Sequence, residues 1–295
     1  NILFLTMSLG IENFPSRGIY TDLVRKFRDR GHEVYIVFPR ERRHGLHTEM
    51  RDQDRVHLLG VKTLNVTKTN IIEKGVGQVS IEFLYKRAIK KYFKNVSFDL
   101  ILYSTPPITF PNVIEYVKKM NPYAKTYLLL KDIFPQNAVD MGMLSKKGLK
   151  GLLYKFFRTK EKKLYALSDY IGCMSPANVS YILDHNPEIA ADRVEVAPNS
   201  LELVESEKII DKDILEKYGL PIDVPIFIYG GNLGVPQGIP FLIFCSVVIY
   251  PVIPPGMVIF RIIPTAAHTL EDVERTLAAF RDIKERLDRG EFDKE

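Results

Sequence analysis

The sequence predicts an α/β protein built on a Rossmann-like parallel sheet with helices on both faces. Apolar runs typical of buried strands alternate with segments of helical periodicity from the first residues onward. The interval from the first run, at residues 2–7, to the second, at residues 34–38, holds one helix and has the length of a β–α–β unit.

The first helix is expected at residues 20–30, where Leu23, Val24 and Phe27 recur at helical spacing and Gly31 follows as a C-terminal glycine. The alternation then repeats along the chain. Further helices are expected near residues 81–94, 112–120, 146–167 and 178–184, and further strands at residues 100–103, 126–130, 170–174 and 194–197. This repetition predicts one large sheet.

Composition changes divide the chain into four segments. Residues 1–201 form the Rossmann-like domain, and residues 202–222 are polar and charged, which is typical of an interdomain connection. Residues 223–246 open a new apolar strand and a glycine-bearing turn, as a truncated or substituted second α/β domain would. Residues 247–295 have the pattern strand–loop–strand–helix.

The bulk composition is that of an ordinary globular protein, with 46% hydrophobic and 26% charged residues and a net charge of +5. Cys173 and Cys245 lie far apart and have no metal-like spacing, which favours a reducing compartment. The chain opens directly on a strand-like run, and prolines divide the uncharged stretch between Asp223 and Arg261. We therefore expect a cytoplasmic protein without a membrane span.

Polar residues follow four of the predicted strands. They are Ser16, Arg17 and Gly18 after the first strand, Thr105 after the strand at 100–103, Lys131 and Asp132 after the strand at 126–130, and Asn199 after the last strand. Ligands of open parallel sheets bind at the carboxyl ends of the strands. Each group alone is also explained as turn chemistry, but four groups at one rim indicate a site.

Asp132 is the candidate catalytic residue. A carboxylate at a strand end is suited to orient a hydroxyl group of a substrate or to act on its proton. The alternative is that Asp132 only caps the turn that follows.

Seven segments carry a resemblance to a known family. They are ILFLT, GIYTDLVRKFRDRGHEVYIV, FDLILYSTPP, LLLKDIFPQNAVDMGML, LSDYIGCMSPAN, VEVAPNS and PIFIYGGNLGVPQGIPFLI. In this order and spacing, residues 1–243 resemble family 4 glycosyltransferases with two Rossmann domains (GT-B), of the kind that assembles capsule, O-antigen (lipopolysaccharide) and exopolysaccharide. The resemblance implies an N-terminal acceptor domain, a nucleotide sugar as donor, retention of anomeric configuration, and no metal or cofactor.

The resemblance also assigns residues. Ser16, Arg17, Gly18, Thr105 and Asn199 would face the acceptor, and Asp132 would lie in the acceptor cleft. The turn with Gly230, Gly231, Asn232, Gln237 and Gly238 would approach the donor diphosphate. Asn232 and Gln237 stand where many relatives carry Arg and Lys, so backbone N–H groups would do more of the binding.

The last segment departs from that family. Residues 247–295 resemble the C-terminal end of α-oxoamine synthases, which are pyridoxal-phosphate enzymes that join an acyl-CoA to an amino acid. Arg261 matches the arginine that binds the substrate carboxylate there, but the lysine motif for the cofactor is missing. We therefore expect a composite chain, joined near residues 243–248, that does not turn over a nucleotide sugar by itself.

Residues 146–163 form a basic amphipathic helix. The bases Lys147, Lys150, Lys155 and Arg158 accompany Phe156 and Phe157, a combination typical of contact with an anionic membrane surface. A solvated helix whose apolar side packs on the sheet is the alternative. A lipid-linked acceptor would require access to the membrane, which predicts a peripheral location at the inner face of the plasma membrane.

Three functions follow from these patterns. The leading prediction is a glycosyltransferase that moves a sugar from a nucleotide sugar to a lipid-linked or polysaccharide acceptor, with no nucleic acid as partner. The alternatives are a fragment of a pyridoxal-phosphate acyl-CoA synthase and a non-catalytic basic surface-binding module. Asp52 and Asp54 imitate a metal-binding pair, but they lie between Arg51 and Arg55, and we expect no metal there.

Overall fold

The computed structural model describes residues 1–67, 69–203, 245–248 and 259–262, together with positions 278, 281, 282, 285 and 289. The chain divides into two compact units, Asn1–Ser206 and Glu207–Glu295. The first unit holds the large sheet, and in the second the described strands β9 (Cys245–Val248) and β10 (Ile259–Ile262) form an antiparallel pair.

The first unit is built on an eight-stranded sheet with the order β3-β4-β2-β1-β5-β6-β7-β8. The strands are β1 (Ile2–Leu5), β2 (Val34–Glu41), β3 (Glu49–Gln53), β4 (Val56–Thr63), β5 (Leu100–Ser104), β6 (Lys125–Leu130), β7 (Tyr170–Cys173) and β8 (Val194–Val196). All neighbours pair in parallel except β3 and β4. The predicted α/β fold with a Rossmann-like parallel sheet is thus confirmed.

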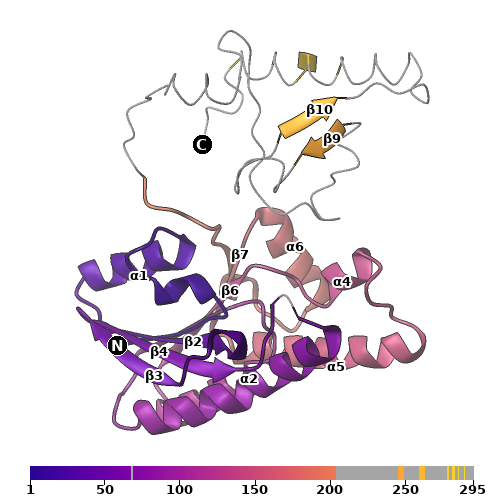
Figure 1. Cartoon of the computed structure of the whole chain (residues 1–295). Helices are drawn as coiled ribbons and strands as arrows, with labels where there is room; N and C mark the ends of the chain where they lie inside the picture. Colours follow the sequence, from indigo (N-terminus) through magenta and orange to yellow (C-terminus); the bar gives the residue numbers. More distant parts are fainter. Residues whose placement is uncertain are drawn as a thin grey trace, which may run out of the picture. The chain divides into compact units, whose positions relative to one another are not determined.

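Helices cover both faces of this sheet. They are α1 (Ile19–Asp29), α2 (Ile71–Tyr92), α3 (Pro111–Met120), α4 (Gln136–Asp140), α5 (Gly148–Leu167) and α6 (Pro176–His185), with short 3₁₀ turns η1 (Leu9–Glu12), η2 (Arg42–His44) and η3 (Ala191–Arg193). Figure 1 shows α1 on one side of the strands and α2 and α5 on the other. Because the chain reverses its direction of travel across the sheet after β4, right-handed crossovers place the later helices opposite α1.

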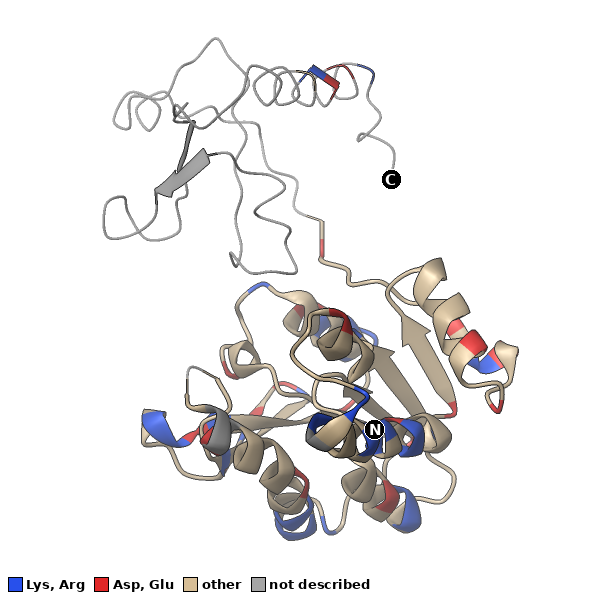
Figure 2. Cartoon of the chain, turned by 90° about the vertical axis from the view of Figure 1, so that its right-hand side faces the viewer, with Lys and Arg blue, Asp and Glu red and all other residues tan. Residues whose placement is uncertain are grey.

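Two apolar clusters form the core, one on each face of the sheet. Val24 of α1 packs with one cluster, which also contains Phe4 and Leu129. Tyr85 of α2 and Leu164 of α5 belong to the other. The charged residues lie on helices and loops, whereas the central strands are almost free of them (Figure 2).

Two features differ from the predicted elements. The helix expected at residues 81–94 begins at Ile71, because the Asn70 side chain caps it by accepting a hydrogen bond from the Glu73 N–H at 2.8 Å. The hairpin β3–β4 was not predicted. Its turn residues Asp54 and Arg55 have positive φ angles of 42° and 59°, and β3 is a polar edge strand without an apolar run.

Candidate functional site

Three side chains from three elements converge at the carboxyl rim of the sheet. Tyr20 lies in the first turn of α1, Ser104 ends β5, and Asp132 follows β6. Burial raises the pKa of the Tyr20 hydroxyl, a hydrogen bond with Ser104 acts against this, and the negative charge of Asp132 raises the pKa further. The three groups are therefore close enough to interact, and they place polar chemistry where open parallel sheets bind ligands.

Thr105 fixes the loop that carries Asp132. Its side chain is 2% exposed, and the hydroxyl accepts hydrogen bonds from the backbone N–H of Lys131 at 3.0 Å and of Asp132 at 3.4 Å. The same hydroxyl donates to the Asp132 carbonyl at 3.4 Å. Because its hydroxyl is occupied by these hydrogen bonds, Thr105 positions the loop. Its predicted role toward an acceptor would therefore be indirect, through the position of Asp132.

The carboxylate of Asp132 is itself available. Asp132 is exposed, and within residues 1–67 and 69–203 nothing forms a hydrogen bond or an ion pair with its carboxylate. The surrounding protein nevertheless desolvates the group in part, and this raises the pKa of Asp132 above its usual value. A raised pKa makes the carboxylate a stronger base than an ordinary aspartate.

Hydrogen bonds to Asp22, Arg25 and Glu202 hold the loop between β1 and α1 in place. The Asp22 carboxylate accepts hydrogen bonds from the Gly18 N–H at 3.2 Å and from the Glu202 N–H at 2.8 Å. Arg17 donates to the Glu202 carbonyl at 3.3 Å, and the Ser16 carbonyl accepts from Arg25 at 2.9 Å. The predicted residues Ser16, Arg17 and Gly18 thus lie together at the start of α1, but the Gly18 N–H already has an anionic partner.

A buried arginine supports the same loop. Arg40 is 2% exposed at the end of β2, and its guanidinium donates to Glu12 and to Glu49, each at 2.9 Å. Glu12 belongs to η1, which leads into Ser16. This ion-paired arginine fixes the path of the chain before α1, so the rim is rigid on that side.

The remaining predicted rim residue, Asn199, is exposed in the segment after β8. The Ala197 N–H donates to the Cys173 carbonyl at 2.7 Å and keeps the beginning of this segment on β7. The predicted donor-binding residues lie outside the described part of the chain. They are Gly230, Gly231, Asn232, Gln237 and Gly238.

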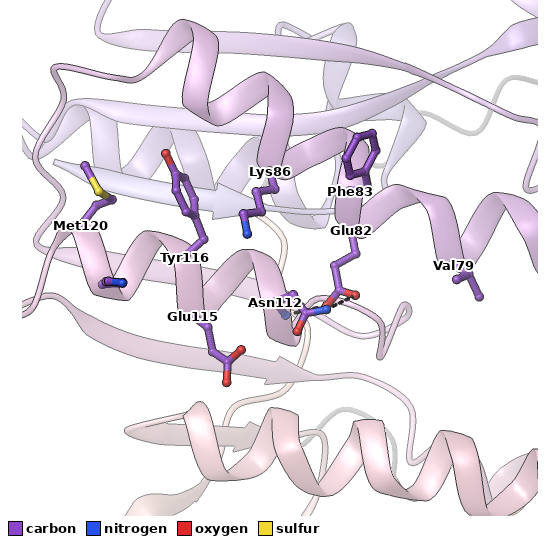
Figure 3. A pocket seen from close by; sticks show the side chains of 9 residues that line it. Val79, Glu82, Phe83, Lys86, Asn112, Glu115, Tyr116 and Met120 are labelled. Carbon is purple, nitrogen blue, oxygen red and sulfur yellow. Dashed lines mark hydrogen bonds between the residues drawn. The ribbon is translucent and has the colours of Figure 1, made fainter.

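A cavity of about 610 Å³ lies elsewhere, in a groove between α2 and α3 (Figure 3). Apolar side chains of Val79, Phe83 and Met120 line it, and each of them is more than half exposed. Its two acidic residues are already paired, Glu82 with Lys160 at 3.2 Å and Glu115 with Lys163 at 2.9 Å. The groove therefore offers no unpaired carboxylate among its described residues, whereas Asp132 at the carboxyl rim does.

Exposed apolar side chains lie on α2, beside the groove, and also on α5. We call this the α2–α5 surface, and Glu82 and Lys160 join its two helices at 3.2 Å. Its exposed members are Val76, Val79 and Phe83 on α2 and Leu152, Leu153 and Phe156 on α5, with the exposed bases Lys147, Lys150 and Lys155.

Two residues of the predicted membrane face are turned inward. Phe157 packs edge-on against Phe134, with ring centroids 5.0 Å apart, and so connects α5 to the loop that carries Asp132. Arg158 pairs with the buried Glu161 and donates to Asn186 at 2.6 Å and to the His185 carbonyl at 3.1 Å. Because its donors are used, Arg158 fastens α5 to α6, unlike the three exposed lysines.

The acidic pair at residues 52 and 54 belongs to the β3–β4 hairpin. The Asp52 carboxylate lies 2.6 Å from Nδ1 of His57. Among the residues that the structure describes, no group of three or more His, Cys, Asp or Glu side chains is arranged to hold a metal ion. None of the helices in that part of the chain is both long enough and apolar enough to cross a membrane.

Comparison with known proteins gives one curated relative at the sequence level. A segment of 76 residues, 23% of this chain, is 43% identical to Cysteate-C-fatty acyltransferase of Capnocytophaga ochracea. This chain covers 17% of that relative, so the similarity is local. No family model matches the sequence.

Solved structures resemble the chain in fold. Sucrose-phosphate synthase from Thermosynechococcus elongatus has a TM-score of 0.52 at 13% identity, over 76% of this chain and 54% of that one. OtsA in its apo form has a TM-score of 0.48 at 9% identity, over 68% of this chain and 50% of that one. The chain thus spans about half the length of these structures. Its mixed α/β architecture, with a mostly parallel sheet of eight strands, is the Rossmann-like fold of GT-B glycosyltransferases.

Proposed function

We propose that the chain derives from a retaining, metal-independent glycosyltransferase, and that its first unit holds a lipid-linked or polysaccharide acceptor. The observation that carries the proposal is the exposed carboxylate of Asp132 at the carboxyl rim of the sheet, on a loop that the Thr105 hydroxyl holds through the Lys131 N–H at 3.0 Å. The similarity to sucrose-phosphate synthase in fold supports a nucleotide sugar as the donor.

In this proposal the rim positions the acceptor. Asp132 orients the acceptor hydroxyl or takes its proton, and the Tyr20 hydroxyl offers a further hydrogen bond to a sugar. The acceptor oxygen forms a bond to the anomeric carbon, and the bond from that carbon to the diphosphate breaks. The turn at residues 230–238 would stabilise the departing diphosphate through its backbone N–H groups.

The α2–α5 surface is our candidate for membrane contact. Phe83 is 66% exposed and Leu152 is 64% exposed, and Lys147, Lys150 and Lys155 lie beside them on α5. Exposed apolar side chains next to bases favour an anionic bilayer surface. Phe157 of α5 contacts Phe134 in the loop that carries Asp132, and this link between the two elements suits an acceptor held in a membrane.

A second candidate rests on the local similarity to Cysteate-C-fatty acyltransferase, which favours an acyl-transfer fragment. Addition of pyridoxal phosphate to the chain would decide this: a visible absorbance band would support an acyltransferase, whereas we expect none, because the lysine motif is missing.

The transferase proposal is tested by completing the donor side. Residues 1–243 are joined to the donor half of a family 4 enzyme and incubated with labelled UDP- and GDP-sugars and a bacterial lipid extract. We expect label in the lipid fraction, and a loss of about tenfold or more in turnover for Asp132→Asn at unchanged melting temperature. A folded fusion that binds nucleotide sugars but labels no lipid or polysaccharide would overturn the proposal. Normal turnover with a loss of stability would make Asp132 a turn cap.

A further inference from the structure

Lys131 is a half-buried base at the rim of the sheet. It follows β6 directly and precedes Asp132. Within residues 1–67 and 69–203, nothing forms an ion pair or a hydrogen bond with its ammonium group. Other half-buried lysines of the unit are paired, Lys118 with Asp169 at 2.9 Å and Lys160 with Glu82 at 3.2 Å.

This arrangement costs free energy. Burial lowers the pKa of Lys131, and no carboxylate acts against the effect. Lysines that lose part of their hydration are normally paired, because desolvation of a charge is unfavourable unless an opposite charge compensates it. An uncompensated base at the rim of a parallel sheet is therefore suited to an anionic ligand that supplies the missing charge.

Lys131 and Asp132 follow the last residue of β6, Leu130, so both lie in the loop at the rim of the sheet. Neither charge shifts the pKa of the other, so the two residues do not neutralise each other. The Thr105 hydroxyl fixes the Lys131 N–H at 3.0 Å.

We propose that Lys131 binds a phosphate group of the acceptor, while the neighbouring Asp132 engages its hydroxyl. This inference rests on the proposed transferase function and specifies its acceptor as a saccharide attached to a lipid through phosphate. A compact ammonium binds phosphate as a point charge, and one sugar ring would separate the phosphate from the reacting hydroxyl. The diphosphate of the donor is the other phosphate ligand that Lys131 could bind.

Calorimetry on the whole chain distinguishes the two sources. The probes are geranyl diphosphate for a lipid phosphate, geraniol as its neutral analogue, and UDP for the donor. We expect Lys131→Met to weaken geranyl diphosphate binding about tenfold, which is the loss of one charge-assisted contact, and Lys131→Arg to retain most of it. Lys125→Met is the matched control, because Lys125 is exposed at the opposite end of β6 and should leave the affinity unchanged.

Three results would overturn the inference. The first is that Lys131→Met binds geranyl diphosphate as tightly as the natural chain does. The second is that Lys125→Met loses as much affinity for geranyl diphosphate as Lys131→Met. The third is that Lys131→Met loses affinity for UDP alone. Binding needs no sugar transfer, so a transferase assay that fails while Lys131 governs diphosphate binding would count against the proposed function and not against this site.

Stability provides a second readout. Without ligand, Lys131→Met should raise the melting temperature, because it removes an uncompensated charge, whereas Lys118→Met should lower it by removing the ion pair with Asp169. A lower melting temperature for Lys131→Met, with diphosphate affinity intact, would show that Lys131 only supports the fold.

Discussion

The Asp22 carboxylate accepts a hydrogen bond from the Glu202 N–H at 2.8 Å, across 180 residues of sequence. Lys26, one turn further along α1, adds an ion pair to the Glu202 side chain at 2.6 Å. The hydrogen bond from Glu202 is the main reason why the pKa of Asp22 is lowered. The first turn of α1 therefore anchors the chain where it leaves β8 and also forms one wall of the predicted acceptor site.

Asp22→Ala should release this anchor. The substitution leaves the Gly18 and Glu202 N–H groups without their acceptor, and we expect a loss of about 2 kcal/mol in the free energy of unfolding. Limited proteolysis should show new cleavage within residues 198–203. Asp29→Ala on the same helix is the control, because the Asp29 side chain is exposed and bonds only to neighbouring arginine. An identical digestion pattern in both variants would contradict the anchor.

Arg158 and Lys155 should behave differently although both are bases on α5. Arg158→Met leaves the buried Glu161 without its partner, and we expect a loss of about 3 kcal/mol in the free energy of unfolding. Lys155→Met should change it by less than about 0.5 kcal/mol, since the side chain is exposed. Urea denaturation measures both. Equal stabilities would mean that Arg158 belongs to the solvent-exposed side after all.

Asp169 should make stability depend on pH in the acid range. Burial acts to raise its pKa, but hydrogen bonds from Lys118 and Thr126 outweigh this and hold the pKa at about 2, below the ordinary value of 3.8. Because the pKa of Asp169 is lower in the folded state, its ionised carboxylate stabilises the fold at pH values above the ordinary pKa of 3.8. This stabilisation is lost as the pH falls from 3.8 toward 2.

We therefore expect Asp169→Asn to cost about 1–2 kcal/mol at pH 7, less than the full conversion of the pKa shift because solvent screens a partly exposed group. The difference between the variant and the natural chain should be roughly halved near pH 3. Urea denaturation across this range is the measurement. A difference that stays constant with pH would show that hydrogen-bond geometry, and not charge, is responsible.

The α2–α5 surface should bind anionic vesicles. Changing Lys147, Lys150 and Lys155 to Gln should reduce co-sedimentation with vesicles that contain phosphatidylglycerol and should weaken its salt dependence. The matched control changes three exposed bases at the amino edge of the sheet, which are Arg30, Lys94 and Lys125. If both triple variants lose binding equally, the effect comes from net charge and the surface has no special role.

The sequence predicted the parallel sheet because its inner strands are buried on both faces and read as continuous apolar runs. It did not predict β3, whose residues Glu49–Gln53 are polar because an edge strand faces solvent. The apolar residues Val56, Leu58 and Leu59 of β4 are typical of a buried strand, but no strand was predicted there.

The site was predicted in part. The position of Asp132 after β6 followed from the alternation of elements, but the convergence of Tyr20 and Ser104 on it depends on tertiary packing. The sequence also did not predict that Arg158 is paired inside the protein. Helical spacing indicates a basic stripe on α5 but does not show that Arg158 bonds to Glu161 and Asn186. Lys131, which has no counterion within residues 1–67 and 69–203, could not be recognised from the sequence, because ion pairs depend on tertiary packing.

The most direct test of the account is to locate the bound acceptor. A geranyl-diphosphate-linked saccharide that carries a diazirine on the sugar is bound to the whole chain and photolysed, and the modified peptides are identified by mass spectrometry. We predict modification within residues 16–20, 104–107 and 131–136, and its loss when the unlabelled compound competes. Specific modification confined to the α2–α3 groove, or none at the rim when the compound is shown to bind, would contradict an acceptor site at the carboxyl ends of the strands.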